Sequence, residues 1–402
     1  MYPNDIVDTF QKHFDHPPKI VVRAPGRINL IGEHTDYNGG YVLPAAIDKA
    51  IYFAVSPRAD DECHFISYDL NENFTISLKN LRNTSTQTWA NYLMGVLDEI
   101  QKITAHSNGH IGHPTSDIGH RLRGINLVFG GDLPSGGGVS SSAAIENGIG
   151  FAVNALFHLG FSRMELLKIS QQAENNFVGM KCGIMDMFAS MMGKHNQVIR
   201  IDCRNYKYVY FPFVAPDMRL VLCNTTVKHA LVDSEYNTRR AECEEGVTVL
   251  QKRNPSLKTL RDVKIGFLKK HEIDLRPVVF KRCKYVVEEI LRVEKACKAL
   301  QKNDFIALGK LMFLTHKGLQ YDYDVSCKEL DFLVEIAQIT EGVLGARMMG
   351  GGFGGCTINL VKADKVGNFI KKMKAAYKDT FLLELPCHVV TPQNGVEIIS
   401  TF

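Results

Sequence analysis

The chain has 402 residues, of which 45% are hydrophobic and 22% are charged, and its formal net charge is +4. These values are typical of a globular protein and exclude extensive disorder, and the small, dispersed charge gives no reason to expect a nucleic-acid or membrane partner. A chain of this length exceeds one comfortable core, so we expect two domains, residues 1–210 and 211–402.

The ten cysteines are dispersed along the chain, and the sequence contains neither a C-x-x-C pair nor an H-E-x-x-H motif. This pattern favours reduced thiols over a disulfide framework, and any metal should be held by oxygen atoms. The first residues form no basic and apolar leader, and no apolar run is long enough to span a membrane. We therefore expect a cytoplasmic location. Small-molecule partners and a monomeric state are further expectations.

The first part of the chain mixes helical and extended patterns. The expected elements are a helix over 5–14, strands at 20–22, 41–43, 51–55 and 74–76, and a helix over 91–103. A loop is expected at residues 24–26, because Ala-Pro-Gly interrupts the first strand pattern. The polar stretch 104–120 should be an exposed loop.

The rest of the chain continues this α+β pattern. The expected elements are a strand at 125–129, helices from 140 to about 159 and over 164–177, a strand at 198–201, helices at about 234–251, 284–301, 304–317 and 328–339, and strands near 219–223 and 356–361.

A glycine-rich loop after Phe129 opens onto the helix that begins near residue 140. Glycines let backbone N–H groups approach an anion closely, and a helix N-terminus adds roughly half a positive charge there. The loop lacks the G-x-x-x-x-G-K-[ST] pattern, so it would be a different kind of phosphate cradle. Its three serines, residues 140–142, could also coordinate Mg²⁺, whereas the simplest alternative is a helix cap without a ligand.

Residues 23–40 form a polar segment crowded with hydrogen-bonding groups. The carboxylates of Glu33 and Asp36 can accept bonds from vicinal hydroxyls, and His34 can donate or accept, which are the groups that a sugar requires. The alternative is a solvated surface loop.

Two acids follow at positions 174 and 186, the second after a glycine turn. One could hold a metal that bridges nucleotide phosphates, and the other could take the proton of an attacking hydroxyl, unless both are unrelated surface acids. The glycine string at 350–355 is a poor Rossmann fingerprint because it lies near the C-terminus and precedes a strand. We interpret it as a turn that supports an active site.

Three of these segments together resemble a known family, the galactokinases of the GHMP small-molecule kinases. Residues 27–38 resemble the galactokinase signature, 134–144 the superfamily's phosphate loop and 347–356 its third motif, in the expected order. The resemblance spans nearly the whole chain, and the first motif is specific to the galactokinase branch. It implies an α+β, two-domain GHMP kinase fold with the active site in the cleft between the domains.

The resemblance also implies an activity, which is ATP-dependent phosphorylation of the C1 hydroxyl of galactose with Mg²⁺. It implies that Asp186 is the general base and that Arg27 orients Asp186 and offsets developing charge. The implied galactose-binding residues are Glu33, His34, Asp36, Gly183 and Tyr236. The implied phosphate contacts are Gly136, Gly138, Ser140 and Ser141, and the implied Mg²⁺ ligands are Ser142 and Glu174. Trp89 is placed beside the adenine, with an ordinary core tryptophan as the alternative.

The chain departs from the family pattern at three positions, Met187, Asp324 and Lys328, where Gln, Glu and Pro are usual. Met187 follows the implied base, so the polarity around that base is in question. The alternatives are a kinase for N-acetylgalactosamine or arabinose, and a galactose-sensing regulator without turnover. A nicotinamide-dependent oxidoreductase would rest on the C-terminal glycine string alone. The Ser142-Ala143 pair and Asp186 are present, so we expect catalysis.

Overall fold

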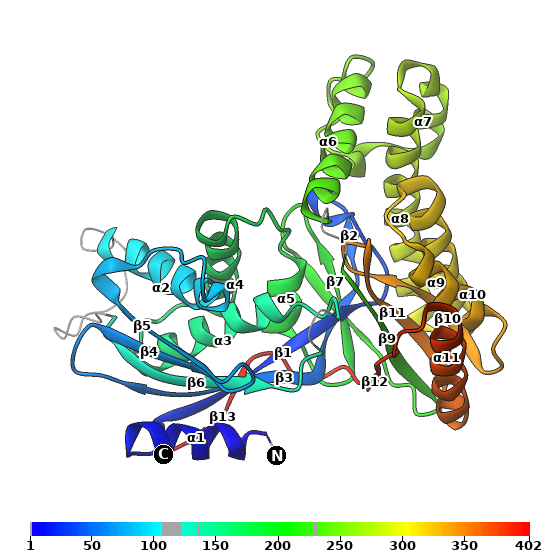
Figure 1. Cartoon of the computed structure of the whole chain (residues 1–402). Helices are drawn as coiled ribbons and strands as arrows, with labels where there is room; N and C mark the ends of the chain where they lie inside the picture. The colour runs from blue at the N-terminus through cyan, green and yellow to red at the C-terminus, as the bar shows by residue number, and fades with distance from the viewer. Residues whose placement is uncertain (1, 107–121, 135–136, 229–231) are drawn as a thin grey trace.

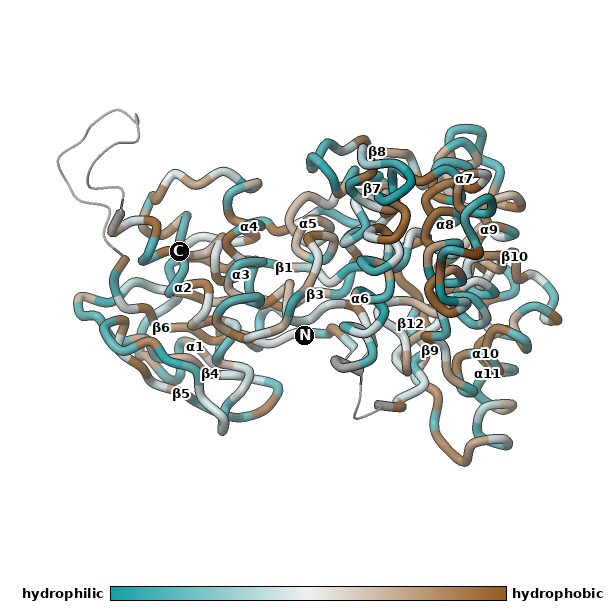
Figure 2. The backbone as a smooth tube through the Cα atoms, turned by 90° about the horizontal axis from the view of Figure 1, so that it is seen from above, coloured by the Kyte–Doolittle hydropathy of each residue, from teal (hydrophilic) through white to brown (hydrophobic). Residues whose placement is uncertain are grey.

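The computed structural model describes residues 2–106, 122–134, 137–228 and 232–402, which form two halves side by side (Figures 1 and 2). A six-stranded sheet in the order β13-β1-β3-β6-β4-β5 organises the first half. Its strands are β1 (Ile20–Asn29), β3 (Pro44–Pro57), β4 (Glu62–Ser67), β5 (Glu72–Ser77), β6 (Ile125–Gly131) and β13 (Glu397–Thr401). Its helices are α1 (Asn4–Phe14), α2 (Thr88–His106), α3 (Ser141–Leu156), α4 (Arg163–Gln172) and α5 (Met185–Met192).

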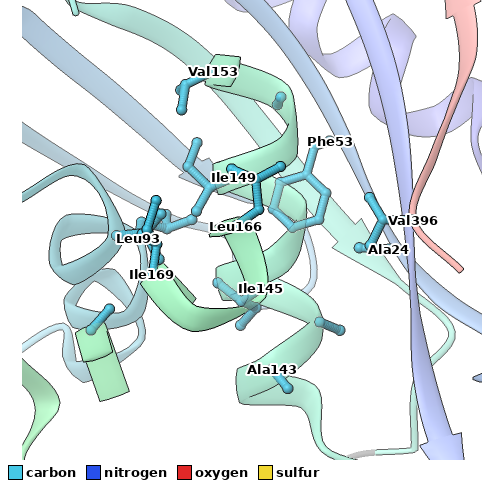
Figure 3. Close-up of a cluster of buried hydrophobic side chains, with 14 of the residues drawn as sticks. Ala24, Phe53, Leu93, Ala143, Ile145, Ile149, Val153, Leu166, Ile169 and Val396 are labelled. Atoms are coloured by element: carbon cyan, nitrogen blue, oxygen red, sulfur yellow. The ribbon is translucent and has the colours of Figure 1, made fainter. Parts of the chain in front are cut away.

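Successive side chains along each strand point to opposite faces of the sheet, and both faces are covered by helices. Val21, Ala54 and Val128 pack with helix α1 on one face. Val22, Phe53 and Leu127 belong to the larger cluster on the other face, which α2 to α5 cover. Figure 3 shows Ile149 and Val153 of α3 in this cluster, with Phe53 beside the helix. This core fixes α3, whose N-terminal end carries the three serines.

The second half contains a four-stranded sheet in the order β10-β11-β9-β12, and a smaller sheet, β2-β7-β8, lies between the halves. These strands are β2 (Tyr41–Val42), β7 (Gln197–Asp202), β8 (Tyr208–Pro212), β9 (Met218–Lys228), β10 (Val343–Met349), β11 (Gly354–Lys362) and β12 (Cys387–Val390). The helices are α6 (Val232–Gln251), α7 (Ile265–Lys270), α8 (Pro277–Gln301), α9 (Phe305–Gly318), α10 (Lys328–Gln338) and α11 (Val366–Phe381). Short helical turns are η1 (Asp36–Asn38), η2 (Leu78–Asn80), η3 (Ala173–Val178), η4 (Leu260–Asp262), η5 (Glu272–Asp274), η6 (Leu319–Tyr323) and η7 (Ala363–Lys365).

The α+β class is confirmed, and the predicted helices are present with altered ends. The expected loop at 24–26 is wrong, because β1 runs through it to Asn29. The pairing of β1 with β3 shifts register between Pro25 and Arg27, and this bulge accommodates the proline inside a strand. The expected loop at 104–120 lies mostly outside the described residues, and its first residues end helix α2. The domain boundary near residue 210 stays a prediction, although β13 pairs with the first sheet.

Each of the ten cysteines is a free thiol, as the sequence predicted. Among the described helices, none combines the length and apolar character needed to cross a membrane.

Helix α9 packs directly against the backbone of β10 at Gly309. A Cβ atom on Gly309 would lie 2.0 Å from the carbonyl oxygen of Leu344. Gly309→Ala should therefore destabilise the protein by about 3 kcal/mol, measured by urea unfolding. Gly266→Ala in α7, where nothing lies within 4 Å of an added Cβ, is the control and should be neutral or slightly stabilising. Equal stability of the two variants would contradict the close packing.

Candidate active site

A cavity of about 640 Å³ lies between the two halves of the molecule. It brings together most of the site residues that the sequence predicted, although they come from distant positions. Those lining it are Arg27, Glu33, His34, Asp36, Ser142, Glu174, Gly183, Asp186 and Tyr236. Lining residues that the sequence did not single out include Met180, Lys181, Cys182, Asn237, Arg240 and Glu244.

An ion pair between Arg27 and Asp186 forms part of the cavity wall. Arg27 Nε and Nη2 donate to the two carboxylate oxygens of Asp186, each at 2.8 Å. Ser140 Oγ also donates to Asp186, and Arg27 Nη1 donates to the carbonyl oxygen of Gly138. Burial lowers the pKa of Arg27, but the charge and hydrogen bonds of Asp186, together with the charges of Glu33 and Asp36, outweigh burial, so the pKa is raised. The bidentate geometry holds Asp186 in one orientation, in the first turn of α5.

A second ion pair joins the two halves at Glu33. Its Oε1 accepts from Arg347 Nη1 at 3.0 Å and from the backbone N–H of Gly350 at 2.9 Å. Arg347 is fully buried, and its other donors bond to the carbonyl oxygens of Leu30 and Asn29. The glycine string that the sequence singled out therefore supports the Glu33 loop from behind.

The imidazole of His34 is held by the protein at both nitrogens. Nδ1 lies 2.8 Å from the hydroxyl of Tyr37, and Nε2 lies 3.2 Å from the carbonyl oxygen of Gly351. A carbonyl can only accept, so Nε2 carries the proton and Nδ1 accepts from Tyr37. Burial lowers the pKa of His34 to about 4, which leaves the ring neutral near pH 7. A ligand that bonds to His34 would therefore use its backbone, which is left-handed with φ 59°.

Behind Tyr37 the hydrogen bonds continue into the second half. Tyr37 Oη lies 2.8 Å from Tyr323 Oη, which lies 3.3 Å from Cys243 Sγ. Because Tyr37 donates to His34, Tyr323 must donate to Tyr37. The ring of Tyr236 on α6 packs against His34, with the ring centres 5.4 Å apart. His34, Tyr323 and Cys243 are buried, and Tyr37 connects His34 to the other two through hydrogen bonds.

Asp36 begins the turn η1, and its carboxylate lies directly against Gly183 in the cavity wall. A Cβ atom on Gly183 would lie 1.8 Å from Asp36 Oδ2, so a larger residue would displace the carboxylate. Burial raises the pKa of Asp36 to about 6, and the charges of Asp186 and Glu33 add to this effect. The ionised carboxylate of Asp36 is therefore destabilised by its surroundings, and a ligand that donates hydrogen bonds to it would offset this cost.

Ser142 in the first turn of α3 and Glu174 in η3 both line the cavity and offer oxygen atoms to it. The carboxylate of Glu174 is buried, which raises its pKa, while hydrogen bonds from Cys182 and Ser142 act in the opposite direction. A hydroxyl and a carboxylate suit Mg²⁺, which takes one or two protein ligands and completes its shell with phosphates and water. The donor set therefore fits the implied cation.

A third acid, Glu146 in helix α3, was not predicted from the sequence. It is fully buried, and among the described residues neither of its carboxyl oxygens has a hydrogen-bond partner. Burial raises its pKa well above the ordinary value, and Glu174 and Asp186 add to the effect. Its four-residue spacing from Ser142 was the available signal, because such residues share a helix face.

The remaining predicted residues lie outside this cavity lining. Gly138 and Ser140 border it through their bonds to Arg27 and Asp186, and Ser141 begins α3. Gly136 lies outside the described residues.

Trp89 packs against the rings of Phe74 and Phe129 in the first half, and its Nε1–H donates to Glu72 at 2.6 Å. Its placement beside adenine stays a prediction.

The three departures from the family pattern leave the cavity intact. Met187 is buried in the core cluster of the first half, so its side chain does not change the polarity of the cavity wall. Asp324 Oδ2 lies 3.3 Å from Arg282 and 3.5 Å from Arg239. Lys328 is exposed at the start of α10.

Three family models match the chain in order. They are a galactokinase galactose-binding signature over residues 8–57, a GHMP kinases N-terminal domain over 91–194 and a GHMP kinases C-terminal domain over 296–379. A mevalonate kinase structure matches with a TM-score of 0.61 at 19% identity over 93% of this chain and 99% of that one, which shows the shared fold. The fold and the cavity thus define a small-molecule kinase of the GHMP type.

Whole-chain comparisons narrow this class. Galactokinases from Clostridium beijerinckii and Chloroflexus aurantiacus are 40% and 39% identical, over 98% and 97% of this chain and 99% and 96% of theirs. A Lactococcus lactis galactokinase complexed with galactose matches with a TM-score of 0.90 and 32% identity, covering 99% of this chain and 100% of that one. The chain belongs to the galactokinase family, and the resemblance seen in the sequence is confirmed.

The raised pKa of Asp36 predicts a stability effect that depends on pH. The folded carboxyl titrates near 6 instead of 3.8, so the folded state binds more protons between these values and stability falls as pH rises through this window. Asp36→Asn removes that loss. The unfolding free energy of the variant minus that of wild type should therefore increase by about 2 kcal/mol from pH 4 to pH 7.

Urea unfolding of the ligand-free protein at both pH values measures this gain, with the exposed Asp217→Asn as the control. A difference between Asp36→Asn and wild type that stays constant with pH would contradict the shift.

Proposed function

We propose that this protein transfers the γ-phosphoryl group of ATP to the C1 hydroxyl of galactose, giving galactose 1-phosphate and ADP. The observation that carries the assignment is the Asp186 carboxylate, fixed by Arg27 in a cavity that sugar-binding groups also line. Family membership supplies the substrates, and this geometry supplies a mechanism.

Asp186 is the proposed general base. Its carboxylate takes the proton of the C1 hydroxyl as that oxygen bonds to the γ-phosphorus, and the bond to the β–γ bridging oxygen breaks to release ADP. Arg27 keeps the carboxylate aimed and offsets negative charge that builds up at the transferring group. Most of the remaining rate enhancement comes from holding the two substrates in line.

Galactose is held by groups that the fold has already ordered. Glu33 and Asp36 accept bonds from its hydroxyls, Tyr236 bounds the pocket, and Gly183 leaves room beside Asp36. His34 contributes its backbone, since both ring nitrogens are occupied. Acceptors that lose their partner when a hydroxyl is missing reject the wrong sugar strongly.

The nucleotide side uses the glycine loop and the start of α3. Gly136, Gly138, Ser140 and Ser141 are the proposed phosphate contacts, at a helix N-terminus that favours anions. Ser142 and Glu174 are the proposed ligands of Mg²⁺, which would neutralise phosphate charge when bound. Trp89 stays the proposed adenine neighbour. A cytoplasmic location and a monomeric state also stay predictions.

Galactose should be the preferred sugar over N-acetylgalactosamine and arabinose. The galactose-binding signature spans residues 8–57, which include Glu33 and Asp36. Initial rates of ADP release with each sugar and MgATP test this. A higher kcat/KM for N-acetylgalactosamine or arabinose would favour a kinase for that sugar. Background rates with all three sugars would favour a galactose sensor without turnover.

Replacing the proposed base should separate catalysis from binding. Asp186→Asn keeps the shape but removes the proton acceptor, so kcat should fall by about a thousandfold while galactose still binds. ADP release measures kcat, and calorimetric titration with galactose measures binding. Turnover within a few-fold of wild type would show that Asp186 is not the base.

A further inference from the structure

We propose that Glu146 holds a water molecule on the divalent cation placed at Ser142 and Glu174, and is therefore a positioning residue of the metal site. This inference rests on the proposed function, because that cation arrives with ATP. Neither the family resemblance nor the sequence motifs assigned any role to Glu146.

The first observation is an unsatisfied acid in the interior. Glu146 has no exposed surface, and both of its carboxyl oxygens lack a hydrogen-bond partner among the described residues. A buried polar group left without a partner costs roughly 1 to 3 kcal/mol, and a charged one costs more. Such groups are rare in folded proteins, and a bound water or ion that completes their hydrogen bonding is one of the explanations for them.

The second observation is where this acid lies. Glu146 follows Ser142 by one helical turn on the same face of α3. The charges of Glu174 and Asp186 act on it across the interior. Ser142 and Glu174 both line the cavity, whereas Glu146 does not. Glu146 therefore lies one layer behind the proposed metal ligands.

A carboxylate behind the proposed metal ligands suits the chemistry of a hydrated cation. Mg²⁺ keeps several of its waters when proteins bind it, and those waters are strong hydrogen-bond donors. A carboxylate behind the ligands can accept from such a water, and the positive charge of the cation offsets the repulsion between the neighbouring acids. An aliphatic side chain at position 146 would fill the space without the cost, so the acid is explained by what it binds.

Glu146→Gln tests this role, because it keeps the size and removes the charge. Glu335→Gln, on an exposed position of α10, is the matched control. The first readout is Mn²⁺ binding in the presence of ADP, measured by the paramagnetic resonance signal of free Mn²⁺. We expect the affinity to fall about tenfold or more in Glu146→Gln and to stay at the wild-type value in Glu335→Gln.

The second readout is the thermal stability of the free protein in a chelator at pH 8. Without the cation, the acid only costs stability, so Glu146→Gln should melt at the wild-type temperature or a few degrees higher. Unchanged Mn²⁺ binding would overturn the proposal and make Glu146 an internal acid without a metal role. A strongly lowered melting temperature would also overturn it, because the carboxylate would then stabilise the fold.

The wild-type protein separates these results from a failure of the proposed function. If it phosphorylates galactose and binds Mn²⁺ with ADP, the variant alone decides the role of Glu146. If it does neither, the kinase assignment itself is wrong, and this proposal with it.

Discussion

The double hydrogen bond between Arg27 and Asp186 is the constraint on which the rest of the site depends. It joins β1 to the start of α5, and through Gly138 and Ser140 it also reaches the glycine-rich loop before α3. Buried ion pairs contribute little net stability, because desolvation offsets most of their attraction. The pair is better understood as fixing position, since it places one carboxylate where the proposed sugar and nucleotide sites meet.

Arg347 fixes the position of the two halves relative to each other, as Arg27 fixes the position of Asp186 within the site. It is fully buried, and it reaches Glu33, 314 positions earlier in the chain, together with backbone carbonyls at the end of β1. Five donors in a rigid plane allow one side chain to hold several acceptors at fixed angles. A buried ion pair therefore joins the two halves that line the cavity.

The sequence predicted those parts of the site that lie in short, recognisable motifs. The glycine loop, the polar segment at 23–40 and the acids at 174 and 186 all lie in or beside the cavity, because short motifs need particular residues at fixed spacing. The strand through Pro25 was not predicted, because a proline followed by a glycine usually ends a strand. In the structure, the register shift with β3 lets the strand continue past both residues.

Long-range pairing could not be predicted. Nothing near Arg347 in the sequence points to Glu33, and nothing near Tyr323 points to Tyr37, because both contacts depend on how distant elements pack. Glu146 was overlooked for a related reason. An acid in an apolar helix resembles a surface position until the fold shows that it is enclosed.

The strand β13 gives the first sheet an unusual order of assembly. Residues of β1 pair with Glu397–Thr401, so this edge of the sheet is completed by a strand that is synthesised after all the other strands of the same sheet. Until then, the backbone groups of β1 on that side have no partner and are open to association with other chains. The exposed edge of β1 must therefore stay protected from aggregation until the residues of β13, more than 360 positions later, have been synthesised.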